Sequence, residues 1–166
     1  MNKLSEYLSS LNICKEAKAW LLENSDKTNK ELFKNCPNVS WLAYLFKEHI
    51  ILNQNEAVEI LINLANTKID ERTMTSITSA KKWLANPTQE NLKLCEKYLK
   101  DVKAKAFDIA DILLFVIVKE NINLGDNIYF ASTLLPETER TNINLLTTPF
   151  KNFKTIEERL LQNKPF

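Results

Sequence analysis

The sequence predicts an all-α fold, and its glycine content and hydrophobic periodicity are the main reasons. Gly125 is the only glycine among the 166 residues. Hairpin-rich β folds depend on glycine at positive φ, so a sandwich or barrel is disfavoured. Apolar residues instead recur three and four positions apart along most of the chain, which is typical of helices packed on a core. We therefore expect a compact domain of about seven or eight helices.

Length and composition indicate a single helical domain over residues 1–166. Hydrophobic residues make up 45% of the chain and charged residues 26%, proportions that are ordinary for a globular protein and too apolar for disorder. The 22 basic and 21 acidic side chains nearly cancel, so no net field attracts nucleic acid or an acidic membrane. We expect neither of them as a partner.

The cysteines and the N-terminus indicate an intracellular protein without disulfides. Cys14, Cys36 and Cys95 lie far apart and form no Cys-x-x-Cys pair, so we expect three buried thiols and no zinc site. Residues 1–6 lack the apolar core of a signal peptide, and no apolar run reaches the roughly 18 residues of a membrane span. These features favour the cytoplasm. Glycine-rich phosphate loops are also missing, so no cofactor is expected.

Polar residues and prolines predict where several helices begin and end. A side-chain oxygen before a helix can accept a hydrogen bond from a free N–H of its first turn, and a glutamate three residues later can complete a capping box. Residues expected to begin helices in this way are Thr28, Asn38, Asp70, Thr88 and Thr155, with Glu31 and Glu158 completing boxes. Pro37 and Pro87 end the preceding helices. Ile128–Leu135 fits a helix or a strand, and helix is slightly favoured.

Residues 88–121 contain no helix breaker and predict one long helix. Apolar residues over Leu92–Val116 alternate steps of three and four, which indicates a packing seam. A straight helix of this span would be about 50 Å long, whereas a domain of this size has a radius of gyration of about 15 Å. We therefore expect a kink at Phe107 and Asp108. Asp108 could cap a new segment in which Asp111 occupies the third position.

The reactive side chains predict no catalytic or metal-binding site. His49 is the only histidine and lies on the apolar face of its helix, which favours a core position over a catalytic one. Asp108 and Asp111 could form a carboxylate pair, but helix capping explains their spacing more simply. We therefore expect no enzymatic activity and no bound metal.

Two further groups of residues favour structural roles. Arg72 follows the expected cap Asp70 by two positions, so it can anchor a helix start to a neighbouring element through charge-assisted hydrogen bonds. Trp20, Trp41 and Trp83 could stack on a ligand, yet they lie on or beside apolar helix faces. We expect all three tryptophans in the core.

Three short segments together carry a family resemblance. The first has Asp70, Arg72, Ile77, Ala80 and Trp83 of an Asp-x-Arg-Pro-x-x-Ala-Ile-x-Ala-Ala-x-x-Trp pattern, with Thr73, Ser76 and Ser79 in place of the proline and two alanines. The others are Ala17-x-x-Trp20-Leu21 and Cys36-Pro37-x-x-x-Trp41-Leu42. In these segments the chain resembles the all-helical immunity proteins of bacterial polymorphic toxin systems, in the group numbered five.

The resemblance covers residues 11–103. It implies a helical scaffold that binds and neutralises a cognate toxin by stoichiometric protein–protein interaction, and it brings no catalytic residue with it. Residues 104–166 depart from the family pattern, because the later helix is rich in Leu, Lys, Ile and Phe where the family has alanine. The chain therefore divides into a family-like scaffold and a divergent C-terminal part.

The divergent part is the expected source of partner specificity. It holds most of the Phe and Tyr residues of the chain, and aromatic side chains are enriched among interface anchors. Candidate partner-binding residues are Phe107, Asp108, Asp111, Phe115, Tyr129 and Phe130. An equally good explanation is that these aromatics pack the C-terminal part onto the scaffold.

The alternative function is a self-associating helical scaffold of phage or bacterial origin. It is motivated by the Leu92–Val116 seam, which could pair two copies of the chain as a homodimer. The partner is thus expected to be a toxin in the leading hypothesis and a second copy in the alternative.

Overall fold

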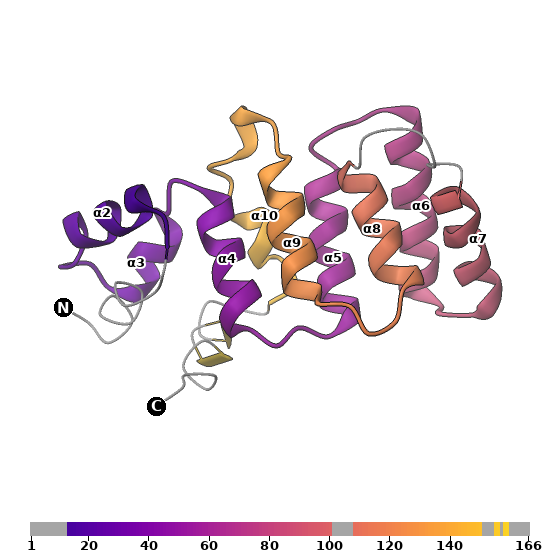
Figure 1. The fold of residues 1–166 in the computed structure, drawn as a ribbon, viewed down its shortest axis with the longest axis horizontal. Helices are drawn as coiled ribbons and strands as arrows, with labels where there is room; N and C mark the ends of the chain where they lie inside the picture. The colour runs from indigo at the N-terminus through magenta and orange to yellow at the C-terminus, as the bar shows by residue number, and fades with distance from the viewer. Residues whose placement is uncertain (1–12, 101–107, 151–154, 157, 160–166) are drawn as a thin grey trace.

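The computed structural model describes residues 13–100, 108–150, 155–156 and 158–159, and their regular structure is entirely helical (Figure 1). The all-α prediction is confirmed. The α-helices of this described part are α2 (Lys15–Glu23), α3 (Asn29–Lys34), α4 (Val39–His49), α5 (Gln54–Ala65), α6 (Glu71–Ala85), α7 (Gln89–Lys100), α8 (Ile109–Val118), α9 (Leu124–Thr133) and α10 (Asn144–Thr147). A short 3-10 helix, η1 (Glu137–Glu139), precedes α10.

Across the molecule the helices follow the order α4, α9, α5, α8, α6 and α7, with α5, α8 and α9 in the interior (Figure 1). α4 packs on α9, α5 packs on α8 and α9, and α6 and α7 cover the other side of α8. α2 and α3 form one end of the molecule, beyond α4. The core is centred on fully buried side chains of α5, α8 and α9, which include Ile60, Leu61, Leu64, Leu113 and Ile128.

Most of the helix starts follow the capping residues that the sequence predicts. Thr28 forms a capping box with Glu31, Asn38 accepts a hydrogen bond from the Ser40 N–H, and Thr88 accepts one from the Asn91 N–H. Of the last helix, predicted from Thr155, only residues 155, 156, 158 and 159 are described, and all four are helical. The Ile128–Leu135 segment, where helix was slightly favoured over strand, lies largely in α9.

The predicted long helix over 88–121 is realised as two helices, α7 and α8. The expected break is confirmed at Asp108, which forms a capping box with Asp111; Phe107 lies outside the described residues. The two helices lie beside each other instead of forming one rod with a kink (Figure 1). Folding back lets both bury the apolar seam within a compact domain, and Cys95 of α7 and Leu113 of α8 are fully buried.

The single glycine allows α4 and α9 to approach closely. A Cβ atom at Gly125 would lie 2.6 Å from the Lys47 Cα and 2.9 Å from the Phe46 carbonyl oxygen. Backbone atoms cannot move aside as the end of a side chain can, so any larger residue would push the two helices apart. Gly125 therefore sets the distance between α4 and α9, and with it the position of Tyr129 beside α4.

The C-terminal part packs against the scaffold. Leu146, Phe150 and Ile156 are buried in the core, and the Phe150 ring lies 5.7 Å from that of Phe46. The Arg159 guanidinium donates two hydrogen bonds of 2.6 and 2.8 Å to the Glu56 carboxylate at the start of α5. For Phe150, these contacts support the packing explanation of the C-terminal aromatics; Phe153 and Phe166 lie outside the described residues.

Deletion of residues 136–166 should therefore unfold the protein. Emptying a buried Leu or Phe site costs about 2–5 kcal/mol, so removal of three such sites is comparable to the roughly 5–15 kcal/mol that stabilises a typical domain. We expect loss of the helical circular dichroism signal and of a cooperative thermal transition. Retention of both by the truncated chain would show that this segment contributes little to the core.

Candidate functional site

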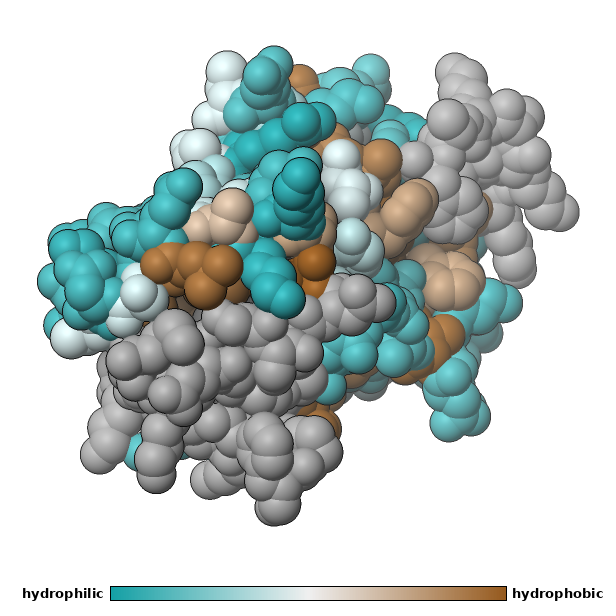
Figure 2. Space-filling view, turned by 60° about the vertical axis from the view of Figure 1, so that its left-hand side comes forward, coloured by the Kyte–Doolittle hydropathy of each residue, from teal (hydrophilic) through white to brown (hydrophobic). Residues whose placement is uncertain are grey.

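An open apolar pocket lies between the α2–α3 end and helices α4 and α9. Its volume is about 280 Å³. Figure 2, which brings this end of the molecule forward, shows hydrophobic side chains interrupting a largely hydrophilic surface. We call this open apolar pocket the aromatic pocket. It is lined by Ile13, Cys14, Ala17, Trp20, Leu21, Leu32, Phe33, Cys36, Ser40, Trp41, Leu42, Tyr44 and Tyr129.

Four aromatic rings from three helices form much of the wall of the pocket. Trp20 of α2 and Trp41 of α4 are tilted against each other, with ring centroids 6.2 Å apart. Tyr44 of α4 and Tyr129 of α9 meet edge to face at 5.9 Å. These separations are typical of favourable aromatic pairs. All four side chains are only partly buried, so some ring surface is open to a ligand.

The prediction of three core tryptophans is correct for one of them. Trp83 is 7% exposed and belongs to the core of the α6 side. Trp20 and Trp41 are half-buried and line the aromatic pocket, so their assignment to the core is wrong. Tyr44, which the sequence analysis did not select, lies three positions after Trp41 and therefore on the same helix face. The spacing of Trp41 and Tyr44 could have indicated a shared aromatic face on α4. It could not reveal that residues of α2 and α9 lie opposite that face.

Two of the three cysteines line the pocket, in different environments. Cys36 is buried and its thiol donates a 3.4 Å hydrogen bond to the Asn38 carbonyl; burial raises the pKa of this thiol to about 11. Cys95 is buried elsewhere, as predicted. Cys14 is exposed, which corrects the prediction of a third buried thiol. It lies at the N-cap of α2, before the residues that the helix buries.

A lysine ammonium lies against two of the pocket tyrosines. The Lys47 Nζ is 5.8 Å from the Tyr44 ring centroid and 5.6 Å from that of Tyr129. It also forms ion pairs with Glu48 at 3.5 Å and Asp126 at 3.6 Å. Desolvation opposes the charged form, but the two carboxylates outweigh it and raise the pKa of Lys47. The ammonium therefore remains charged beside these rings at neutral pH.

The candidate partner-binding residues divide between two places. Tyr129 lines the aromatic pocket, and its neighbour Phe130 is 50% exposed. Asp108, Asp111 and Phe115 belong instead to the start and middle of α8, and Phe115 is half-buried. Tyr129 thus lies at the pocket and Phe130 is exposed on the same helix, whereas the candidates on α8 belong to another part of the structure.

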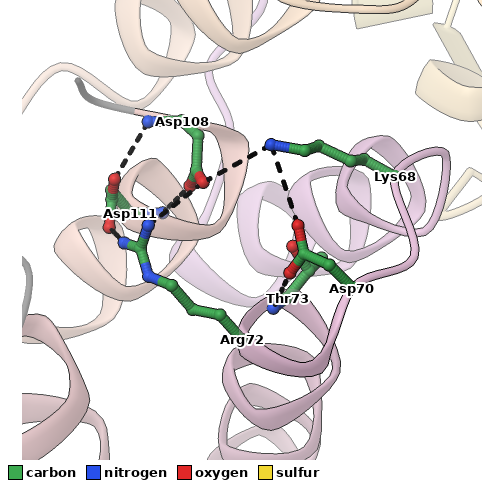
Figure 3. Close-up of polar contacts among 6 residues, drawn as sticks. All are labelled: Lys68, Asp70, Arg72, Thr73, Asp108 and Asp111. Atoms are coloured by element: carbon green, nitrogen blue, oxygen red, sulfur yellow. Dashed lines mark hydrogen bonds and ion pairs between the residues drawn. The ribbon is translucent and has the colours of Figure 1, made fainter. Parts of the chain in front are cut away.

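The aspartates of α8 form a charged cluster with the start of α6 (Figure 3). The Arg72 guanidinium donates one hydrogen bond to Asp111 and one of 3.2 Å to Asp108. Asp70 caps α6 by accepting a 2.8 Å hydrogen bond from the Thr73 N–H. The predicted anchoring of a helix start to a neighbouring element is confirmed.

Asp111 has a structural role within this cluster. Its side chain is fully buried, one carboxylate oxygen accepts from Arg72, and the other accepts a 2.9 Å hydrogen bond from the Asp108 N–H. The Asp108 carboxylate in turn accepts a 3.1 Å hydrogen bond from the Asp111 N–H. A partner at the surface cannot contact a side chain enclosed in this way, so the selection of Asp111 as a direct partner contact is not supported by its position.

No family model, curated protein or solved structure matches the chain. Within the described residues, no group of three or more His, Cys, Asp or Glu side chains is arranged to hold a metal ion. No helix in that part of the chain combines the length and apolar character needed to cross a membrane. The side chain of His49, for which a core position was predicted, is not among the side chains that the structure describes.

Replacement of Arg72 by Met should destabilise the fold by about 3 kcal/mol, because it leaves the buried Asp111 carboxylate without its cation. The double variant Arg72→Met/Asp111→Leu should recover more than half of this loss, since no buried charge remains. Urea unfolding measures both free energies. Lys68→Met is the matched control, because Lys68 is 59% exposed and 4.0 Å from Asp108. Equal, small losses for Arg72→Met and Lys68→Met would contradict the assignment.

Proposed function

We propose that this chain is an immunity-type protein that binds a cognate bacterial toxin in a stoichiometric complex and neutralises it. The aromatic pocket is the observation that carries the proposal. The resemblance of residues 11–103 to immunity proteins supports a toxin as the partner. The residues that carry this resemblance include Trp20 and Trp41 of the pocket. The sequence motif from Asp70 to Trp83 belongs to the scaffold.

The composition of the pocket region suits recognition of a protein. Tryptophan and tyrosine are enriched among the few residues that dominate binding energy at interfaces. Two exposed apolar side chains directly follow lining residues in the sequence: Leu22 after Leu21, and Phe130 after Tyr129. Leu22 and Phe130 add exposed apolar surface on α2 and α9, two of the helices that also contribute pocket residues, which favours a partner larger than a small molecule.

Neutralisation by this protein requires binding and no chemistry of its own. The pocket is formed by side chains of helices, and a rigid surface loses little conformational entropy when a partner docks. A toxin held at this face would have part of its surface covered by the helical end of the molecule. Inhibition then follows from occupancy, with one immunity-type chain per toxin.

The alternative of a self-associating scaffold receives less support from the packing. Its motivation was the Leu92–Val116 seam. Within the described residues, this seam lies where α7 and α8 pack on each other and on the helices beside them. Its buried side chains include Cys95, Leu113 and Val116. The seam is therefore explained by packing within a single chain.

Co-expression with the toxin encoded by an adjacent gene tests the proposal. We expect protection of the cells, and a complex of one chain of each protein by size-exclusion chromatography with light scattering. Phe130→Ala should weaken the complex about 30-fold, which corresponds to 2 kcal/mol for loss of an interface anchor. Ile69→Ala is the control, because Ile69 is 78% exposed and does not line the pocket.

Two outcomes would contradict the proposal. Failure of the wild-type chain to bind the toxin or to protect the cells removes the immunity function. Equal binding by the Phe130→Ala and Ile69→Ala variants, both at wild-type strength, removes the placement of the interface beside Tyr129.

A further inference from the structure

We infer that the aromatic pocket receives one uncharged aromatic side chain from the partner protein. This inference rests on the proposed function and adds the chemistry of the group that is recognised. It is drawn from the volume of the pocket, from the side chains that line it and from the lysine ammonium beside it.

The volume of the pocket fits a single ring-bearing side chain. An apolar cavity of about 150 Å³ binds a benzene molecule, and the pocket measures about 280 Å³. Sites for drug-sized ligands and cofactors occupy about 300–1,000 Å³. The pocket can therefore hold a phenyl, phenol or indole group, and it lies just below the range of sites that take a whole cofactor.

The lining favours an uncharged group. None of the described lining residues carries a charged side chain. The Ser40 hydroxyl, one of the few polar groups there, accepts a 3.2 Å hydrogen bond from the Ser132 hydroxyl. A carboxylate placed among these rings would lose its hydration without gaining an opposite charge, which is costly. An aromatic ring gains edge-to-face contacts with the exposed ring surface of Trp20 and Trp41.

The position of the lysine ammonium disfavours the other common ligand of aromatic pockets, a cation. Rings of tryptophan and tyrosine can surround an ammonium group and attract it through the negative faces of the rings. Here the Lys47 ammonium already lies within 6 Å of Tyr44 and Tyr129. Glu48 and Asp126 balance the charge of Lys47, so what disfavours a second cation is that the Lys47 ammonium already occupies these two rings. The edge-to-face contacts that a neutral ring would make with the two pocket tryptophans need neither of the tyrosine rings.

The pocket can be tested with small probes before any partner is used. Indole is the neutral aromatic probe, and tetramethylammonium is the cationic one. Saturating indole should slow the modification of Cys14 by a thiol reagent about tenfold, the effect of 1.4 kcal/mol of protection. Cys14 reports on the pocket because it lines it and is exposed, whereas Cys36 and Cys95 are buried. Protection by tetramethylammonium with none by indole would overturn the inference.

Filling the pocket provides a second test. Ala17 is buried and lines the pocket, so Ala17→Phe places a ring where the ligand would lie. Binding of indole should fall by about tenfold or more, a loss of at least 1.4 kcal/mol, measured by calorimetry. Ile69→Ala, which is exposed and lies outside the lining, should bind indole normally. Unchanged indole binding by a folded Ala17→Phe variant would overturn the inference.

The same changes applied to the toxin complex separate this inference from the proposed function. Attachment of a bulky maleimide to Cys14 of the wild-type protein, which needs no folding of a variant, should weaken toxin binding about tenfold or more. Full-strength binding by the labelled protein would remove the pocket as the docking point and leave the immunity function intact. If the unlabelled protein does not bind the toxin, the immunity function fails, and the indole measurements still decide what the pocket accepts.

Discussion

The buried pairing of Arg72 with Asp111 is the contact on which the arrangement of the helices depends. Among the described residues, Asp111 is the one charged side chain that is fully buried, and it lies in the first turn of α8, a helix whose other residues are all apolar. Without a cation, such a carboxylate would strongly destabilise the packed state. Arg72 therefore fixes the start of α8 against the start of α6. α8 in turn packs on α5, α6 and α7.

The sequence could predict those features that depend on residues close together along the chain, such as helix caps. Capping by Thr28, Asp70 and Asp108 involves residues three positions apart, so the pattern itself specifies the contact. The folding back of α7 beside α8 and the opening of a pocket around Trp20 depend on contacts between distant segments. An apolar helical stripe looks the same whether it is fully enclosed, as at Trp83, or left half-open, as at Trp20.

The pocket joins the two parts into which the sequence divides. Trp20, Trp41 and Tyr44 come from residues 11–103, in which the sequence analysis expects a scaffold, whereas Tyr129 comes from the remainder of the chain. Gly125 holds α9 close to α4, so the divergent part is placed against the scaffold at a fixed distance. Residues from the first and second parts of the chain therefore meet at one surface, the aromatic pocket. The rest of the divergent part, after Pro136, serves mainly the core.

Hydrogen exchange of the chain with and without the proposed toxin partner tests most directly whether recognition lies at the aromatic pocket. The placement of the interface at this end predicts slower amide exchange in α2 and α9 on binding, and unchanged exchange in α6 and α7. This pattern would also fit the predicted candidates Tyr129 and Phe130. Slower exchange at the starts of α6 and α8, around Asp70 and Asp108, with α2 and α9 unchanged, would contradict it and would place the partner at the charged cluster.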